Sequence, residues 1–202
     1  MLTYEKKMWD DGYVAVAGVD EVGRGCLFGD VVAAAVILPV GLVLDGVDDS
    51  KKLSEKRREE LYPEIMQKAL AVGIGRVDAT VIDRINIRQA ARLAMRRAVG
   101  SLKVKPDCLL VDAETVEWDV PQIAIIHGDS LSQSIAAASI VAKITRDRLC
   151  VEWDAMYPEY GIAMHKGYAT KYHRERLLQY GASPMHRKSF LRNIFTEQME
   201  LF

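Results

Sequence analysis

The chain has 202 residues, of which 50% are hydrophobic and 27% are charged, and its formal net charge is -1 at pH 7. This composition is typical of a globular protein with a sizeable core. The near-zero net charge does not by itself indicate a nucleic-acid-binding protein. Any contact with nucleic acid must therefore depend on local charge. We expect a single domain over residues 1–202 and a monomer.

The cysteines and the amino-terminal segment indicate the compartment. Cys26, Cys108 and Cys150 are widely spaced, and an odd number of cysteines argues against a disulfide framework. Unpaired cysteines suit a reducing compartment, so we expect a cytoplasmic protein. The amino-terminal segment is polar, and no apolar stretch approaches the length of about 18 residues that a membrane span needs. We therefore expect neither a signal peptide nor a membrane contact.

Short apolar runs alternate with longer amphipathic segments, which predicts an α/β protein with a central sheet flanked by helices. The first two runs are joined by a glycine-rich connection and are expected to be antiparallel neighbours. Ser54 is the expected N-cap of the first long helix. The expected strands are the run ending at residue 21, then 31–38, 71–77, 108–111 and 122–126; the expected helices are about 55–70, one or two within 82–102, 130–150 and 169–180.

The chain changes character after residue 152. Short amphipathic pieces follow one another there, including a basic segment, His186-Arg187-Lys188. We expect residues 152–197 to form a helical C-terminal extension of the same domain, followed by a separate tail at 198–202.

Carboxylates end three of the predicted strands. Asp20 and Glu21 end the first, Asp112 follows the 108–111 strand, and Asp129 comes just after the 122–126 strand. Such strand ends gather at one edge of an α/β sheet. Oxygen ligands without clustered His or Cys favour Mg²⁺ or Mn²⁺, and two such ions about 4 Å apart can assist phosphodiester hydrolysis. The simpler alternatives are solvated strand ends and, for Asp129, a helix cap.

The first acidic pair leads directly into a loop with two glycines around an arginine, Gly23-Arg24-Gly25. Glycine lets the backbone approach a ligand closely, and a guanidinium suits phosphate or sugar oxygens. Adjacent residues of a regular strand point to opposite faces, so Asp20 and Glu21 would reach one site together only if a twist or bulge reorients them. The glycines of this loop permit such a twist or bulge, which could let both acids reach one site.

Four arginines recur every four residues at Arg84, Arg88, Arg92 and Arg96. This spacing places them in one row along a helix. The row is either an ordinary solvated face or a groove for a polyanionic backbone.

Several motifs, in this order along the chain, resemble those of ribonuclease HII. The resemblance covers about residues 14–187, and its blocks are jointly specific. They are Asp20-Glu21-Val22-Gly23-Arg24-Gly25, Asp49-Ser50-Lys51-Lys52-Leu53, Gly128-Asp129-Ser130, Ser139-Ile140-Val141-Ala142-Lys143 with Thr145-Arg146-Asp147, and His165-Lys166-Gly167-Tyr168.

The resemblance implies an RNase H-like fold, a mixed central sheet flanked by helices. It also implies Mg²⁺- or Mn²⁺-dependent hydrolysis of RNA in RNA/DNA hybrids and incision 5′ of single ribonucleotides in duplex DNA, with two ions. By position, Asp20, Glu21, Asp112 and Asp129 match the catalytic, metal-binding acids. Gly23, Arg24 and Gly25 match the segment that senses the 2′-hydroxyl, and Tyr168 matches the tyrosine that stacks on the sugar.

Other candidates depend less on the resemblance. Ser50, Lys51, Lys143 and Arg146 are expected phosphate contacts, with ordinary surface polarity as the alternative. Taken alone, Tyr168 reads as a half-buried surface aromatic.

One position departs from the family pattern. Many relatives carry Gly-Asn after the third acid, whereas this chain has Ala113-Glu114. The substitution puts the turn geometry in doubt and adds a charge near the expected ions.

The last five residues, 198–202, resemble the short peptides with which bacterial proteins bind the replication sliding clamp. Gln198, Leu201 and Phe202 would make that contact; the alternative is a tail that packs on its own domain. For the whole chain, the alternative to an enzyme is a non-catalytic module that binds RNA/DNA hybrids. A weaker third option is a magnesium-dependent enzyme for a small nucleotide.

Overall fold

The computed structural model describes residues 1–192 and 194. Its core is a five-stranded sheet in the order β3-β2-β1-β4-β5. β1 pairs antiparallel with β2 and parallel with β4, so the sheet is mixed. The strands are β1 (Val16–Val22), β2 (Val31–Ile37), β3 (Ala71–Val77), β4 (Cys108–Asp112) and β5 (Gln122–Ile125).

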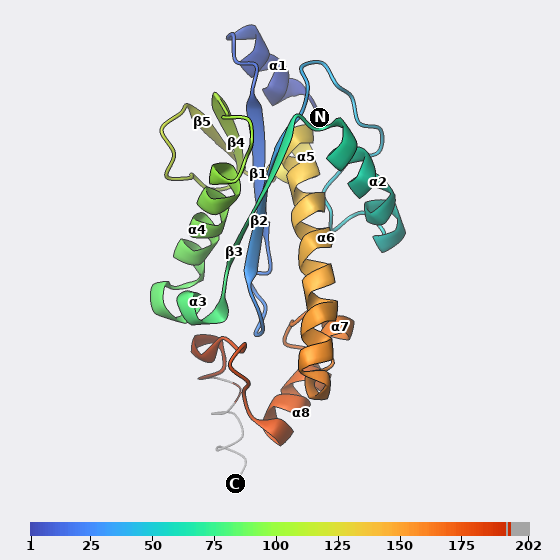
Figure 1. The fold of residues 1–202 in the computed structure, drawn as a ribbon, viewed down its shortest axis with the longest axis vertical. Helices are drawn as coiled ribbons and strands as arrows, with labels where there is room; N and C mark the ends of the chain where they lie inside the picture. The colour runs from blue at the N-terminus through green and yellow to red at the C-terminus, as the bar shows by residue number, and fades with distance from the viewer. Residues whose placement is uncertain (193, 195–202) are drawn as a thin grey trace.

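Helices cover both faces of this sheet, with α4 on one side and α6 and α2 on the other (Figure 1). The predicted fold class and the antiparallel first pair of strands are therefore confirmed. The helices are α1 (Thr3–Asp10), α2 (Glu55–Lys68), α3 (Ala79–Ile85), α4 (Ile87–Gly100), α5 (Gly128–Leu131), α6 (Gln133–Met156), α7 (Ile162–His165) and α8 (Lys171–Tyr180), with 3₁₀ turns at Pro158–Tyr160 and Lys188–Phe190.

Strand alternation divides the core between the two faces. Ala17 and Val19 of β1 face α4 in one apolar cluster, whereas Val16 packs in a cluster with Ile135 of α6 on the other face. Gly18 lies where α6 crosses β1 most closely, and a Cβ at this position would overlap the Ser134 carbonyl. The close crossing places the first turn of α6 directly against Gly18 of β1.

The long helix differs from the predicted 130–150. Ser132 caps α6, accepting a hydrogen bond from Ile135 N at 3.2 Å, and separates it from the short α5. α6 then continues to Met156, beyond the expected start of the C-terminal extension at residue 152. Trp153 is buried and packs with Phe28, which explains why the helix continues.

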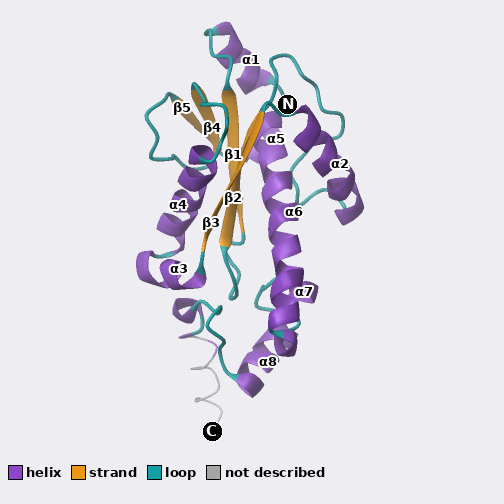
Figure 2. Ribbon diagram, viewed as in Figure 1, coloured by secondary structure: helices purple, strands orange, loops and turns teal. Residues whose placement is uncertain are grey.

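The C-terminal elements form the narrow lower end of the molecule in Figure 2, where α7 and α8 follow α6. Within the described part of the chain, no helix has both the length and the apolar character needed to cross a bilayer. The predicted clamp-binding residues Gln198, Leu201 and Phe202 lie outside the described residues.

Candidate active site

Strand register brings the first two acids together. Val19 of β1 is paired with Val111 of β4 in parallel register, so the next residue on each strand is a carboxylate, Asp20 and Asp112. Both valines face α4. The two carboxylates therefore point to the opposite side of the sheet, towards α6.

Asp129 completes a cluster of three carboxylates. Oxygens of Asp20, Asp112 and Asp129 lie within 4.8 Å of one another, and we call these residues the acidic cluster. Gly128 N donates to Asp112 Oδ1 at 2.7 Å, so one acid fixes the turn that carries another. Asp129 does not cap the following helix, because Ser132 does. The structure thus brings together acids from three separate elements.

Glu21 lies beside this cluster but outside it. β1 pairs with β2 in unbroken register from Ala17 to Val22, so no bulge interrupts that pairing. The Glu21 carboxylate is nevertheless close enough for its charge to raise the pKa of Asp20. Arg24 Nη1 donates to Glu21 Oε1 at 3.1 Å. The other oxygen, Oε2, is buried and has no hydrogen-bond partner within residues 1–192 and 194. An unpaired buried carboxylate oxygen is available to a cation or to a donor on a substrate.

Burial and mutual repulsion destabilise the ionised acids. Burial, followed by the charges of Glu21 and Asp112, raises the pKa of Asp20 well above its ordinary value. Burial also raises the pKa of Glu21, although Arg24 opposes this, and burial with the charge of Asp112 raises the pKa of Asp129. A divalent cation would relieve this repulsion. The all-oxygen donor set and the orphaned oxygen of Glu21 fit a hard ion of the Mg²⁺ or Mn²⁺ class.

Two hydroxyls that support the cluster were not predicted in this role. Ser139 of α6 hydrogen-bonds to the Asp20 side chain. Its hydroxyl lies 2.7 Å from that of Ser50, which is 4% exposed. The Ser50 hydroxyl therefore contacts Ser139, the residue that supports Asp20. Because it is buried, it is not accessible for the predicted contact with a phosphate. The available sequence signal was a serine among the apolar residues of a buried helix.

Lys51 is placed as a cation beside the acids. Its Nζ lies 3.7 Å from Asp129 Oδ2, and its side chain is 79% exposed. Partial burial lowers the pKa of Lys51, but the carboxylates of Asp20 and Asp129 outweigh burial, so the pKa is raised overall. The charge of Asp49 also helps to raise the pKa of Asp129, a proximity that the sequence did not indicate. Lys51 therefore remains positioned to meet a phosphate near the cluster.

Arg146 was predicted to contact phosphate at the surface, but it is buried. It is 1% exposed, and its guanidinium donates to the carbonyls of Phe28, Asp30 and Lys166 at 2.7 to 3.1 Å. These buried carbonyls need a donor, and a guanidinium supplies several in one plane. Lys143 is also engaged, with Nζ 2.6 Å from Asp147 Oδ1. Arg146 is thus an internal brace.

The glycine loop and Tyr168 face one another. Gly23 has a φ of +91°, and a Cβ there would overlap the Arg146 side chain, so only glycine fits. A Cβ on Gly25 would lie 4.0 Å from Tyr168 Cε1. Tyr168 is 44% exposed, so its ring is open to a ligand. Two segments predicted to contact one sugar are adjacent in space.

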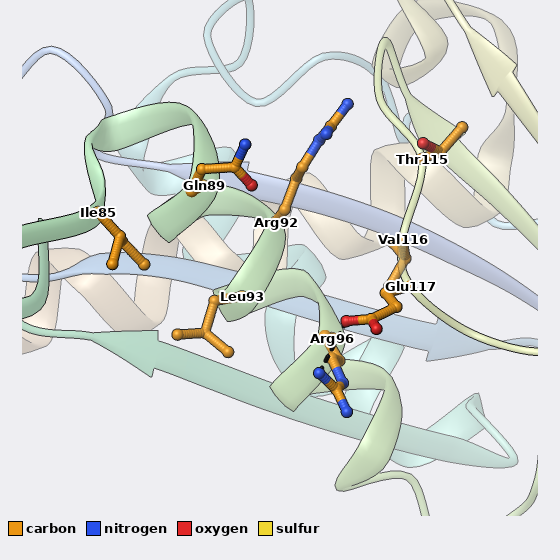
Figure 3. Close-up of a pocket in the computed structure, with 8 residues that line it drawn as sticks. All are labelled: Ile85, Gln89, Arg92, Leu93, Arg96, Thr115, Val116 and Glu117. Carbon is orange, nitrogen blue, oxygen red and sulfur yellow. Dashed lines mark hydrogen bonds and ion pairs between the residues drawn. The ribbon is translucent and has the colours of Figure 1, made fainter.

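The predicted arginine row is divided between two helices, because Arg84 lies on α3 and the other three arginines lie on α4. Those three are paired with acids. Arg88 Nε and Arg92 Nη2 lie 2.9 and 2.7 Å from the two carboxylate oxygens of Glu114, and Arg96 pairs with Glu117 at 2.8 Å. A cavity of about 610 Å³ lies between α4 and residues 115–117, and Figure 3 shows Arg92 and Arg96 among the residues that line it. The acids of the cluster do not line this cavity. The row therefore holds a loop and is not an open polyanion groove.

The same ion pairs explain the unusual Ala113-Glu114. Ala113 adopts a left-handed φ of 50°, the conformation for which glycine is usual. Glu114 is buried and turns towards Arg88 and Arg92. Burial raises its pKa, but the two arginines hold the pKa of Glu114 below its ordinary value overall. The expected turn is kept, and the added charge is compensated.

Comparison with known proteins identifies the family of this chain. The family model described as Ribonuclease HII matches residues 17–196. The chain belongs to the ribonuclease HII family. A relative named Ribonuclease HII from Alkaliphilus metalliredigens (strain QYMF) is 61% identical over 199 residues, covering 96% of this chain and 98% of the relative. The family assignment made from the motifs is confirmed.

Solved structures agree with the ribonuclease HII fold. The ribonuclease H2 from Pyrococcus horikoshii OT3 superposes with a TM-score of 0.76 at 27% identity, covering 92% of this chain and 99% of that one. A structure of the PCNA:RNase HII complex from Archaeoglobus fulgidus gives a TM-score of 0.72 at 28% identity, covering 87% and 94%. The chain is thus an RNase H-type endoribonuclease of type HII, with an acidic cluster suited to divalent metal.

Proposed function

We propose that this enzyme hydrolyses RNA in RNA/DNA hybrids and incises duplex DNA on the 5′ side of single embedded ribonucleotides, leaving 3′-hydroxyl and 5′-phosphate ends. The observation that carries the proposal is the position of the acidic cluster beside a glycine loop and an exposed tyrosine. The cluster can hold metal next to a phosphodiester, while the loop and ring can contact one sugar. Such an enzyme serves the removal of ribonucleotides during DNA replication and repair.

Each residue has a role in this proposal. Asp20, Glu21, Asp112 and Asp129 would hold two divalent ions, Mg²⁺ or Mn²⁺. When bound, such ions supply activation of the attacking water and stabilisation of the leaving oxygen. Lys51 is in place to orient a neighbouring phosphate.

Recognition of the sugar would come from the other side of the site. Backbone groups at residues 23–25 can approach the 2′-hydroxyl, which is both a donor and an acceptor and distinguishes a ribonucleotide from its neighbours. The ring of Tyr168 would stack on the sugar. Specificity then depends on the gap between the loop and the ring.

The direct test is incubation with a duplex that contains one ribonucleotide, with and without Mg²⁺, followed by analysis of the product ends. We expect a metal-dependent cut 5′ of the ribonucleotide and no cut in the matched all-deoxy duplex. Binding without cleavage in the presence of metal would instead support a hybrid-binding module.

We further propose that Gln198, Leu201 and Phe202 bind a sliding clamp. The proposal rests on the residue pattern, and the related archaeal enzyme was solved as a complex with PCNA. Deleting residues 198–202 should weaken binding to a bacterial clamp and leave cleavage of naked substrate unchanged. Equal clamp binding by both proteins would dismiss the proposal.

A further inference from the structure

The basic segment at residues 186–188 is not the charged surface that its composition indicates. His186 is 1% exposed and Arg187 is 0% exposed, whereas Lys188 is exposed. Two potentially cationic side chains are thus withdrawn from solvent, where they cannot meet a phosphate backbone. Their polar atoms are directed at other parts of the protein.

The segment lies against the chain that leaves the glycine loop. Phe28 and His186 form an isolated antiparallel bridge. Gly29 N donates to the Met185 carbonyl at 2.9 Å, and Arg187 N donates to the Leu27 carbonyl at 2.8 Å. The same stretch is tied to the tyrosine segment, because Leu27 N donates to the Gly167 carbonyl at 2.8 Å. Residues 27–29 therefore lie between the two.

Arg187 holds the glycine loop itself. Its Nη1 donates to the Arg24 carbonyl and its Nε to the Gly29 carbonyl, both at 2.9 Å. One guanidinium thus spans the loop from its centre to its end. A planar fork with several donors in fixed directions makes such a double contact, whereas a lysine ammonium does not.

His186 reaches the other side of the gap through a second histidine. His173 Nδ1 lies 2.9 Å from the Tyr168 carbonyl, which only accepts, so Nδ1 carries the proton. The neutral His173 then accepts at Nε2 from His186 Nε2, 3.2 Å away. His186 Nδ1 in turn accepts from Ser183 N at 2.9 Å. The partners fix both tautomers, and every ring nitrogen is satisfied.

We propose that His186 and Arg187 are positioning residues for ribose recognition. Arg187 fixes the Arg24 carbonyl in the glycine loop, and His186 fixes the Tyr168 carbonyl through His173. Two consecutive residues of the C-terminal region thereby set the gap between the loop and the ring. The inference rests on the proposed contact of these two groups with a ribonucleotide.

The test compares binding of two duplexes in the full-length chain carrying Asp20→Asn, which removes cleavage. One duplex contains a single ribonucleotide and the other is all-deoxy, and the binding preference is the ratio of their dissociation constants. Misfolded molecules bind neither duplex, so a loss of folded protein cancels from this ratio. Thermal unfolding is measured in parallel.

Arg187→Lys keeps the charge and the apolar stem but loses the fork. We expect it to lower the preference roughly tenfold, the effect of losing one hydrogen bond from a charged donor. His186→Phe keeps an aromatic ring, removes the donor to His173 and should lower the preference severalfold. Lys188→Ala, the matched neighbour on the surface, should leave the preference unchanged within about twofold, because its side chain is not aimed at either carbonyl.

The outcomes distinguish ribonucleotide recognition itself from the positioning role of His186 and Arg187. If Asp20→Asn alone shows no preference, ribonucleotide recognition fails and this inference fails with it. If Asp20→Asn shows a preference and the added Arg187→Lys or His186→Phe leaves it intact, only the positioning role is overturned. A larger effect from Lys188→Ala than from Arg187→Lys would also overturn it, in favour of simple surface charge.

Discussion

The acidic cluster and the histidines beneath Tyr168 are both buried groups of titratable residues, but they are built in opposite ways. Asp20, Asp112 and Asp129 repel one another, and the nearby Glu21 has an oxygen without a partner in the described chain. His165, His173 and His186, which we call the histidine cluster, are hydrogen-bonded at every ring nitrogen. The acidic cluster therefore requires a cation to balance its charge, whereas the hydrogen bonds of the histidine cluster are already satisfied within the protein.

This difference indicates that the acidic cluster takes part in the chemical step, whereas the histidine cluster holds the shape of the site. Uncompensated like charges reduce the stability of the fold until a cation binds, a cost that is usual at functional sites. A satisfied polar network instead rigidifies its surroundings. The histidine cluster stacks His165 on His173 at 4.3 Å and holds the segment that carries Tyr168.

The largest expected effect comes from breaking the acidic cluster. Asp20→Asn should lower cleavage by at least about 10³-fold, because metal assistance supplies several kcal/mol of transition-state stabilisation. In metal-free buffer the same variant should melt higher than the wild type, because it removes one of three repelling charges. Rate assays with Mg²⁺ and thermal unfolding in chelator measure the two effects. Asp10→Asn, at the exposed end of α1, is the matched control, and a lower melting temperature for Asp20→Asn would contradict the stored repulsion.

Removing the ring that faces the glycine loop should have the next largest effect. Tyr168→Ala should lower cleavage at a single ribonucleotide about 10- to 100-fold, as expected for the loss of one stacking contact. The ring is 44% exposed, so the melting temperature should change little. Tyr180→Ala, at 49% exposure on α8, controls for loss of a surface tyrosine. Unchanged incision would remove Tyr168 from the sugar site.

The histidine cluster predicts a pH dependence of stability. Burial lowers the pKa of His173 to about 4 and that of His186 to about 3. The unfolded chain therefore binds protons below about pH 6.5 that the folded chain does not, so stability is fully present above that pH and falls towards pH 4. His186→Gln should show a shallower loss of melting temperature between pH 7.5 and 5. Both proteins carry the same acids, so parallel curves would exclude the histidines as the cause.

The smallest effect should come from the turn after Asp112. Ala113→Gly should raise the free energy of unfolding by roughly 0.5–1 kcal/mol, because glycine adopts the left-handed φ without steric cost. Ala155→Gly, in the last turns of α6, should instead destabilise by up to about 1 kcal/mol. Denaturant unfolding measures both, and equal changes in the two variants would show that backbone strain at residue 113 is absent.

The sequence predicted the parts of the site that follow from strand ends. Runs of apolar residues ended at Asp20 and Asp112, and strand ends gather at one edge, so their convergence was predictable. The unbroken register of β1 at Glu21 was not predictable, because a bulged strand and a regular strand can have the same composition. The longer α6 was also missed, since Trp153 continues it only through packing on Phe28.

The roles of the two buried arginines were even less predictable from the sequence. Arg146 and Arg187 read as surface charge in the sequence, yet both are enclosed and donate to backbone carbonyls of the 24–30 segment. Nothing in the sequence marks which carbonyls are left without a strand or helix partner. That information exists only after distant segments have been placed, so these braces could be found only in the structure.

The parallel pairing of β1 with β4 also bears on biosynthesis. β1 and β2 can form a local hairpin early, but Asp20 gains its partners only after β4 and α5 have been made and docked. Contacts so distant along the chain form late in folding. A partly synthesised chain on the ribosome therefore lacks the ion-binding centre. The enzyme can become active only after β4 and α5 have packed against β1.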